Sequence, residues 1–163
     1  MTTKLTIEAI ADRTEILERL YAYCRHADRG DAAGMAAQFV EDCAVDLFPD
    51  AERIVRGSSR YRDSLVPLLG KVVAGTHYIS NPEYEFTGPD EAMLHTYMYS
   101  WQRFVPDMKL PDRHRMGRYE VRAVRTEEGW RLAALRLIVA AEDGGDRQGE
   151  HVGRPWPFRL EDR

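Results

Sequence analysis

Asp28 is the residue of this sequence whose position most strongly suggests chemistry. It lies eleven positions after Leu17 and seven after Tyr21, and both spacings are close to whole numbers of helical turns. Its carboxylate therefore falls on the apolar stripe of a helix, where it either meets a cation or lies at the end of the core facing solvent. The alternative is a helix-terminal aspartate that pairs with a neighbouring arginine.

His77 is the second candidate for acid–base chemistry. It begins a segment in which period-2 alternation places His77, Ile79 and Asn81 on one face of a strand. A neutral imidazole can take a proton and return it near neutral pH, as a general base must. The alternative is a core histidine that is satisfied by one hydrogen bond.

Tyr23 and Arg136 are two further candidates. Tyr23 lies five residues before Asp28, which is about 140° around an ideal helix, so the two side chains would flank a pocket rather than touch. Arg136 has apolar neighbours in the last predicted strand. A buried guanidinium there could hold a substrate oxygen or pair with an acid, whereas on an edge strand it would be solvated.

Motifs for other kinds of chemistry are missing from the sequence. It has no glycine-rich phosphate loop, no nucleophile elbow and no Cys or His cluster at metal-ligand spacing. The other histidines are scattered along the chain. We therefore expect neither a metal nor a cofactor, which leaves cofactor-free acid–base catalysis or plain ligand binding.

Composition and charge are those of one ordinary globular domain. The 163 residues suffice for a sizeable core, and 44% of them are hydrophobic. The net charge of −4 argues against a nucleic-acid partner, because such proteins cluster Lys and Arg. Cys24 and Cys43 are not spaced as a disulfide framework. Without an export signal or a membrane-length apolar run, we expect a cytoplasmic protein without membrane contact.

Three helices should position these residues in the first half of the chain. Apolar residues recur at helical spacing, Gly30 ends the first helix and Asp31 can cap the second. Ser58 or Ser59 can cap the third. The expected helices cover residues 6–28, 32–40 and 58–69.

Strands should dominate the second half. After Gly75, long segments with strand character are separated by turn signals, most simply as an antiparallel meander. The expected strands cover residues 44–48, 54–55, 77–86, 92–105, 116–124 and 130–141. Helices followed by such strands predict an α+β domain whose sheet curls around the helices and leaves a cavity for a small ligand.

The ordered set of motifs resembles the SnoaL-like and scytalone-dehydratase-like proteins of the nuclear transport factor 2-like superfamily. The motifs are residues 21–31, 39–46, 76–81, 117–119 and 129–131, together with Arg136. The resemblance covers about Ile7 to Val139 and implies a cone-shaped α+β barrel with a deep pocket. We expect this domain to span residues 1–141 and residues 142–163 to form a C-terminal tail or arm. Relatives use this barrel as dehydratases, dehydrohalogenases, epoxide hydrolases, isomerases and polyketide cyclases.

The same resemblance implies roles for individual residues. The catalytic Asp–His pair of the dehydratase branch falls on Asp28 and His77. The tyrosine and the late arginine of bile-acid dehydratase relatives match Tyr23 and Arg136. The second histidine of scytalone dehydratase corresponds to Trp101, so scytalone is a poor guess for the substrate. We expect the substrate-binding residues to be Asn81, Trp101, Tyr119, Tyr99 and Leu47.

These residues predict a cofactor-independent lyase or isomerase. His77, oriented by Asp28, would remove a proton next to an activating group of a small, largely apolar substrate that is polyketide-, aromatic- or steroid-like. Dehydration or a related elimination would follow. The alternatives are a SnoaL-type polyketide or polyether cyclase and a non-catalytic module for ligand binding or an oxygenase small subunit. Since relatives associate through the outer face of the sheet, we expect a homodimer or homotrimer.

Overall fold

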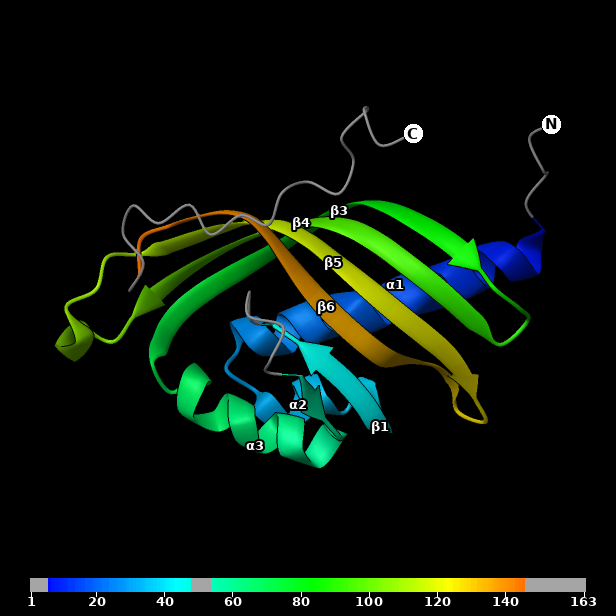
Figure 1. The fold of residues 1–163 in the computed structure, drawn as a ribbon, viewed down its shortest axis with the longest axis horizontal. Coiled ribbons are helices and arrows are strands. Elements are labelled where there is room, and N and C mark those ends of the chain that lie inside the picture. The colour runs from blue at the N-terminus through cyan, green and yellow to red at the C-terminus, as the bar shows by residue number, and fades with distance from the viewer. Residues whose placement is uncertain (1–5, 48–53, 146–163) are drawn as a thin grey trace.

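The computed structural model describes residues 6–47 and 54–145, in which a curved six-stranded sheet wraps around a long helix (Figure 1). The helices are α1 (Ile7–Asp28), α2 (Ala32–Ala36) and α3 (Ser58–Leu69), with a 3₁₀ turn at Pro106–Met108. The strands are β1 (Phe39–Asp46), β2 (Val55–Arg56), β3 (Val72–Phe86), β4 (Glu91–Phe104), β5 (Arg113–Thr126) and β6 (Gly129–Asp143).

Helix α1 follows the predicted pattern closely. The Thr6 side chain caps its first turn by accepting a hydrogen bond from the Ala9 amide at 3.1 Å. Its apolar stripe is buried against β3 and β6, with Ile16 and Leu20 fully enclosed. Gly30, at φ 70°, turns the chain away after Asp28. None of the described helices is long and apolar enough to span a membrane.

Helix α2 is shorter than predicted, and β1 begins earlier. The Asp31 cap is confirmed, since its side chain accepts from the Gly34 amide. The helix nevertheless ends at Ala36, because the chain from Phe39 onwards pairs in parallel with β6. Strand pairing between residues that are at least 90 positions apart in the sequence overrides local helical spacing here. Phe48, the last residue of the predicted strand, lies outside the described residues.

Helix α3 has the predicted bounds but a different cap. Gly57 occupies the N-cap position at φ 90°, and no side chain caps the helix. The prediction of Ser58 or Ser59 as cap is wrong, because Gly57, a glycine at positive φ, takes the N-cap position and places both serines in the first turn. The inner side of α3 buries Tyr61 and Leu65.

The sheet has the order β2-β1-β6-β5-β4-β3. The predicted antiparallel meander of four strands is confirmed for β3 to β6. Strand β1 runs parallel to β6, so the sheet is mixed, and its described strands end at β2 and β3 without closing. Strand β6 continues two residues past position 141, while residues 146–163 of the predicted tail lie outside the described residues.

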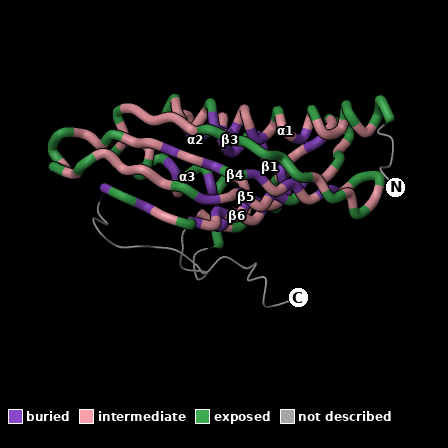
Figure 2. The backbone as a smooth tube through the Cα atoms, turned by 90° about the horizontal axis from the view of Figure 1, so that it is seen from above, coloured by how far each residue is buried: buried purple, intermediate pink, exposed green. Residues whose placement is uncertain are grey.

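Burial alternates along the central strands (Figure 2). On β4, for example, Leu94, Thr96 and Met98 are buried on the inner face, whereas Tyr97 is exposed on the outer face. The inner faces of β4, β5 and β6 therefore form the core with α1. The inward positions near the end of α1 line a cavity instead of a solid core.

Candidate active site

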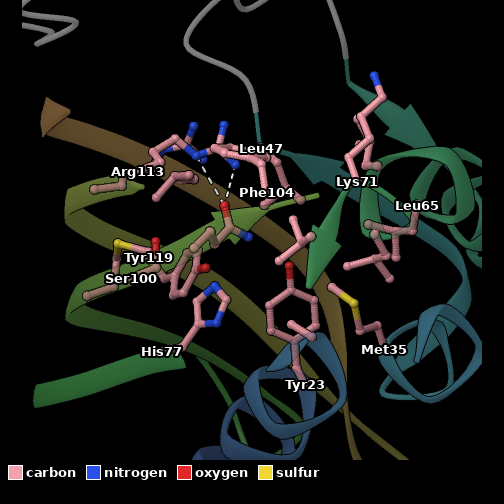
Figure 3. Close-up of a pocket in the computed structure, with 18 of the residues that line it drawn as sticks. Tyr23, Met35, Leu47, Leu65, Lys71, His77, Ser100, Phe104, Arg113 and Tyr119 are labelled. Carbon is pink, nitrogen blue, oxygen red and sulfur yellow. Dashed lines mark hydrogen bonds between the residues drawn. The ribbon is translucent and has the colours of Figure 1, made fainter. Parts of the chain in front are cut away.

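A cavity of about 220 Å³ lies between α3, the end of α1 and the inner face of the sheet (Figure 3). This is below the usual range for drug-sized ligands, which indicates a small substrate. Most of its wall is aliphatic or methionine side chains. The polar or aromatic side chains in its lining are Tyr23, Lys71, His77, Ser100, Gln102, Phe104, Arg113, Arg115 and Tyr119.

Asp28 and His77 meet at the edge of this cavity. Asp28 is the last residue of α1, and His77 lies on β3. Asp28 Oδ1 lies 2.6 Å from His77 Nδ1, and Asp28 Oδ2 accepts from the His77 backbone N–H at 3.2 Å. Both side chains are mostly shielded, at 26% and 10% exposure for Asp28 and His77. The Asp28 carboxylate at the end of α1 therefore lies against the Nδ1 side of the His77 ring.

This contact determines which nitrogen of His77 can act as a base. A carboxylate only accepts hydrogen bonds, so Nδ1 carries the hydrogen and Nε2 keeps its lone pair. The ring of His77 points into the cavity (Figure 3). The carboxylate also stabilises the imidazolium that forms when Nε2 takes a proton, as in an Asp–His–Ser triad. The pair therefore has the arrangement of an oriented general base.

Tyr23 enters the cavity from α1, one and a half turns before Asp28. Its hydroxyl lies 2.9 Å from the hydroxyl of Tyr61 on α3, and its ring packs edge-on against Tyr119. Burial raises the pKa of both Tyr23 and Tyr61 far above the usual value. Tyr23 is therefore a neutral hydrogen-bond donor. Sequence reasoning missed Tyr61, which no local pattern distinguishes from a core tyrosine.

A single row of paired residues crosses four strands at the level of the histidine. His77 is opposite Ser100 on β4, Ser100 is opposite Arg115 on β5, and Arg115 is opposite Glu142 on β6. Directly paired residues point to the same face of a sheet. The row therefore carries a base, a hydroxyl and a guanidinium side by side in the cavity. Ser100, Arg115 and Glu142 were not predicted as site residues.

Glu142 holds Arg115 in place. The Arg115 Nε donates to Glu142 Oε2 at 2.5 Å, and the Glu142 side chain is 1% exposed. A buried carboxylate requires such a cationic partner. Local sequence patterns give no sign of this pair, because the two residues are 27 positions apart and meet only through strand pairing.

Two predicted substrate-binding residues on β4 face away from the cavity. Ser100 and Gln102 line it, so the alternating Tyr99 and Trp101 lie on the outer face. The Tyr99 hydroxyl bonds His114, and the Trp101 indole donates to Asp112 at 3.1 Å. The prediction that Tyr99 and Trp101 bind the substrate is therefore wrong, because both side chains lie outside the cavity lining.

Arg136 and Asn81 also lie outside the cavity lining. Arg136 is on the outer side of β6, 43% exposed, with its Nε 3.5 Å from Asp46 Oδ2. Asn81 is exposed at φ 53°, where the β3–β4 register shifts, so alternation from His77 does not extend to it. The predicted residues Leu47 and Tyr119 do line the cavity.

Within residues 6–47 and 54–145, no three His, Cys, Asp or Glu side chains lie close enough together to hold a metal ion.

The model of the SnoaL-like domain family matches residues 8–136. The chain belongs to the SnoaL-like domain family. No curated protein sequence is similar enough to this SnoaL-like chain to count as a match.

Solved structures share the fold of this SnoaL-like chain. A candidate scytalone dehydratase from Novosphingobium aromaticivorans has a TM-score of 0.78 at 20% identity, over 94% of this chain and 100% of that one. A protein of Kribbella flavida has a TM-score of 0.76 at 22% identity, over 83% and 95%. The hexachlorocyclohexane dehydrochlorinase LinA-type3 of Novosphingobium barchaimii has 0.74 at 15% identity, over 91% and 99%. At these identities the likeness concerns the fold.

Proposed function

We propose that this SnoaL-like chain is a cofactor-independent lyase or isomerase in which His77 is the general base. The observation that carries the proposal is the double contact of the Asp28 carboxylate with His77, at the wall of a small and mostly apolar cavity. Two of the structural neighbours bear dehydratase and dehydrochlorinase names, and both names denote eliminations.

The first step is proton transfer from an activated C–H bond to His77 Nε2. The pair of electrons left on carbon delocalises onto an adjacent carbonyl oxygen, which gains negative charge. Asp28 stabilises the resulting imidazolium through the Nδ1 hydrogen. Such a base contributes roughly 10²–10⁴-fold to the rate.

Two hydroxyl groups are placed to stabilise the developing oxyanion. Ser100 is directly opposite His77 in the sheet, and Tyr23 reaches the cavity from α1. Preorganised donors of this kind lower the barrier because they do not need to reorient during the reaction. In this role Tyr61 donates to the Tyr23 hydroxyl oxygen, which orients Tyr23 and leaves its single hydroxyl hydrogen for the oxyanion. Arg136 has no part in this step, because it lies outside the cavity.

The type of product then depends on where the proton held by His77 is transferred. In a dehydration it passes to the leaving hydroxyl on the neighbouring carbon, the C–O bond breaks, and the electron pair forms a C=C bond. In an isomerisation it returns to a different carbon. Both routes regenerate neutral His77, and neither needs an external oxidant or reductant.

The proposal is tested with a panel of β-hydroxy ketones of one or two rings, incubated with the full chain in D₂O. Exchange of the acidic C–H is followed by NMR, and products are followed by mass spectrometry. Loss of one water identifies dehydration, whereas cyclisation alone conserves mass. His77→Ala and Asp28→Asn should each lower exchange and turnover by about 10²–10⁴-fold. His95→Ala, on the outer face of β4, is the matched control.

Unchanged exchange and turnover in both His77→Ala and Asp28→Asn would refute this mechanism. A chain that turns over no panel member and co-purifies with a second protein would instead favour the non-catalytic module.

A further inference from the structure

We infer that the substrate of this cavity carries a carboxylate and that Arg115 binds it at the end remote from His77. This deepens the proposed function, since it concerns the substrate of the same cavity. It also modifies the expectation of a largely apolar molecule: the body is apolar, and one end is anionic.

The charge of the cavity wall is the first observation. Arg113 and Arg115 contribute cationic side chains to the lining, together with the stem of the exposed Lys71, whose ammonium group points away from the cavity (Figure 3). None of the described lining residues is Asp or Glu, and the acids behind the lining, Asp28 and Glu142, are engaged by His77 and Arg115. The whole chain, in contrast, has a net charge of −4. A cleft lined by one sign of charge with apolar walls concentrates ligands of the opposite sign. The wall thus favours an anion over a neutral molecule.

The second observation is that the Arg115 guanidinium is held in a fixed orientation. Glu142 engages its Nε, and among the described residues no hydrogen-bonding partner is found for its two terminal nitrogens. The side chain lines the cavity and is 18% exposed. A guanidinium held at one edge presents the other edge to a planar acceptor, and carboxylates match that geometry in a bidentate pair.

Arg113 is engaged differently. Its guanidinium donates to the Gln102 side-chain oxygen and lies over the Phe104 ring, with 5.2 Å from Cζ to the ring centroid (Figure 3). Arg113 therefore contributes positive potential at this end of the cavity, whereas Arg115 is the group oriented for direct contact.

The spacing between His77 and Arg115 determines where the carboxylate of the substrate lies. His77 and Arg115 are two strands apart in the same row, which separates their Cα atoms by roughly 10 Å. Glu142 holds the guanidinium on the side away from His77. The carboxylate is therefore separated from the reacting C–H bond by the body of the substrate, about one or two fused rings. Ser100, between them, faces that body or the oxygen at the reacting carbon.

The test compares two probes of the same shape, 2-naphthoate and 2-naphthamide, by isothermal titration calorimetry with the full chain. We expect the carboxylate to bind about ten- to hundredfold more tightly than the amide. Arg115→Gln should abolish this preference. Arg122→Gln, an exposed arginine of the same strand that pairs with Glu91, should retain it.

Arg115→Gln leaves Glu142 buried without its cation and can fail to fold. The double variant Arg115→Gln/Glu142→Gln removes both charges and is measured in parallel, with circular dichroism as the folding check. Equal or undetectable binding of the two probes by the wild-type chain overturns the inference, and so does a folded double variant that still prefers the carboxylate.

The binding test does not depend on catalysis. His77→Ala should keep the preference for the carboxylate while it loses turnover. If His77→Ala instead retains turnover, the proposed function fails and the anionic site stands.

Discussion

The Asp28 carboxylate holds His77 at two points, 2.6 Å from the ring Nδ1 and 3.2 Å from the backbone nitrogen. The first contact orients the ring, and the second ties the end of α1 to β3 at the same position. One side chain therefore fixes the acid and the base relative to each other and ties the C-terminal end of α1 to β3.

Replacing Asp28 with Asn should therefore affect the chemistry more than the fold. The amide oxygen can still accept the Nδ1 hydrogen, but a neutral amide stabilises an imidazolium poorly, so kcat should fall by about 10²–10⁴-fold. The change is measured by steady-state kinetics together with ¹⁵N NMR of the imidazole. Asp63→Asn, exposed on α3, serves as the control. Wild-type kcat in Asp28→Asn would contradict this role.

Tyr61→Phe should weaken catalysis through Tyr23. The substitution removes the hydrogen-bonding partner of the Tyr23 hydroxyl and leaves that group buried without one. We expect a loss of about 1 kcal/mol in unfolding free energy and a decrease in kcat with little change in KM. Tyr78→Phe, exposed on β3, is the matched control. Equal effects of both substitutions on kcat would show that Tyr61 does not position Tyr23.

Asp31 should make stability depend on acid pH. Hydrogen bonds from the Gly34 amide and from His26 lower the pKa of its carboxyl group. Its stabilising effect is therefore present above the unfolded-state pKa of about 3.9 and is lost as the pH falls through the lower folded-state value.

Asp31→Ala should cost about 1 kcal/mol at pH 7 through loss of the helix cap, which lowers Tm by about 2–4 °C. Thermal unfolding followed at several pH values checks this. The difference between the two proteins should shrink in strong acid, and a constant difference down to pH 2 would be inconsistent with a role for the ionised cap.

Gly117→Ala should destabilise the β5–β6 pairing. A Cβ at this position would clash with the Ile138 backbone oxygen, next to a register shift in β5. Because backbone must move to admit it, we expect a cost of about 1–3 kcal/mol in chemical denaturation. Gly88→Ala, with nothing within 4 Å of the added carbon, should be close to neutral.

The outer face of the sheet is where we expect copies of the chain to associate. Tyr78 and Met116 are 63% and 42% exposed there, in one cross-strand row with Tyr99 between them. Exposed apolar groups gathered on one face are typical of protein interfaces. Analytical ultracentrifugation should detect a dimer or trimer that Tyr78→Glu weakens. A monomer at high micromolar concentration would refute this expectation.

Local patterns in the chain were enough to predict α1, the bounds of α3 and most of the strands, whereas α2 ends four residues before its predicted end. The helix up to Asp28 follows from apolar spacing and from Gly30, and the last four strands follow from the turn signals between them. These features depend on interactions between residues a few positions apart. The choice of Asp28 and His77 needed the ordered motifs as well, because each residue alone fits a structural role at least as well as a catalytic one.

Tertiary structure alone decided which side chains share the cavity. Trp101 was expected there and Ser100 was not, yet they differ by one position, and a shift of one residue exchanges the two faces of a strand. Arg115 and Glu142 come together only through the pairing of β5 with β6, and Arg136 is turned outward by the same pairing. Register is a property of the whole sheet, so spacing along one strand cannot supply it.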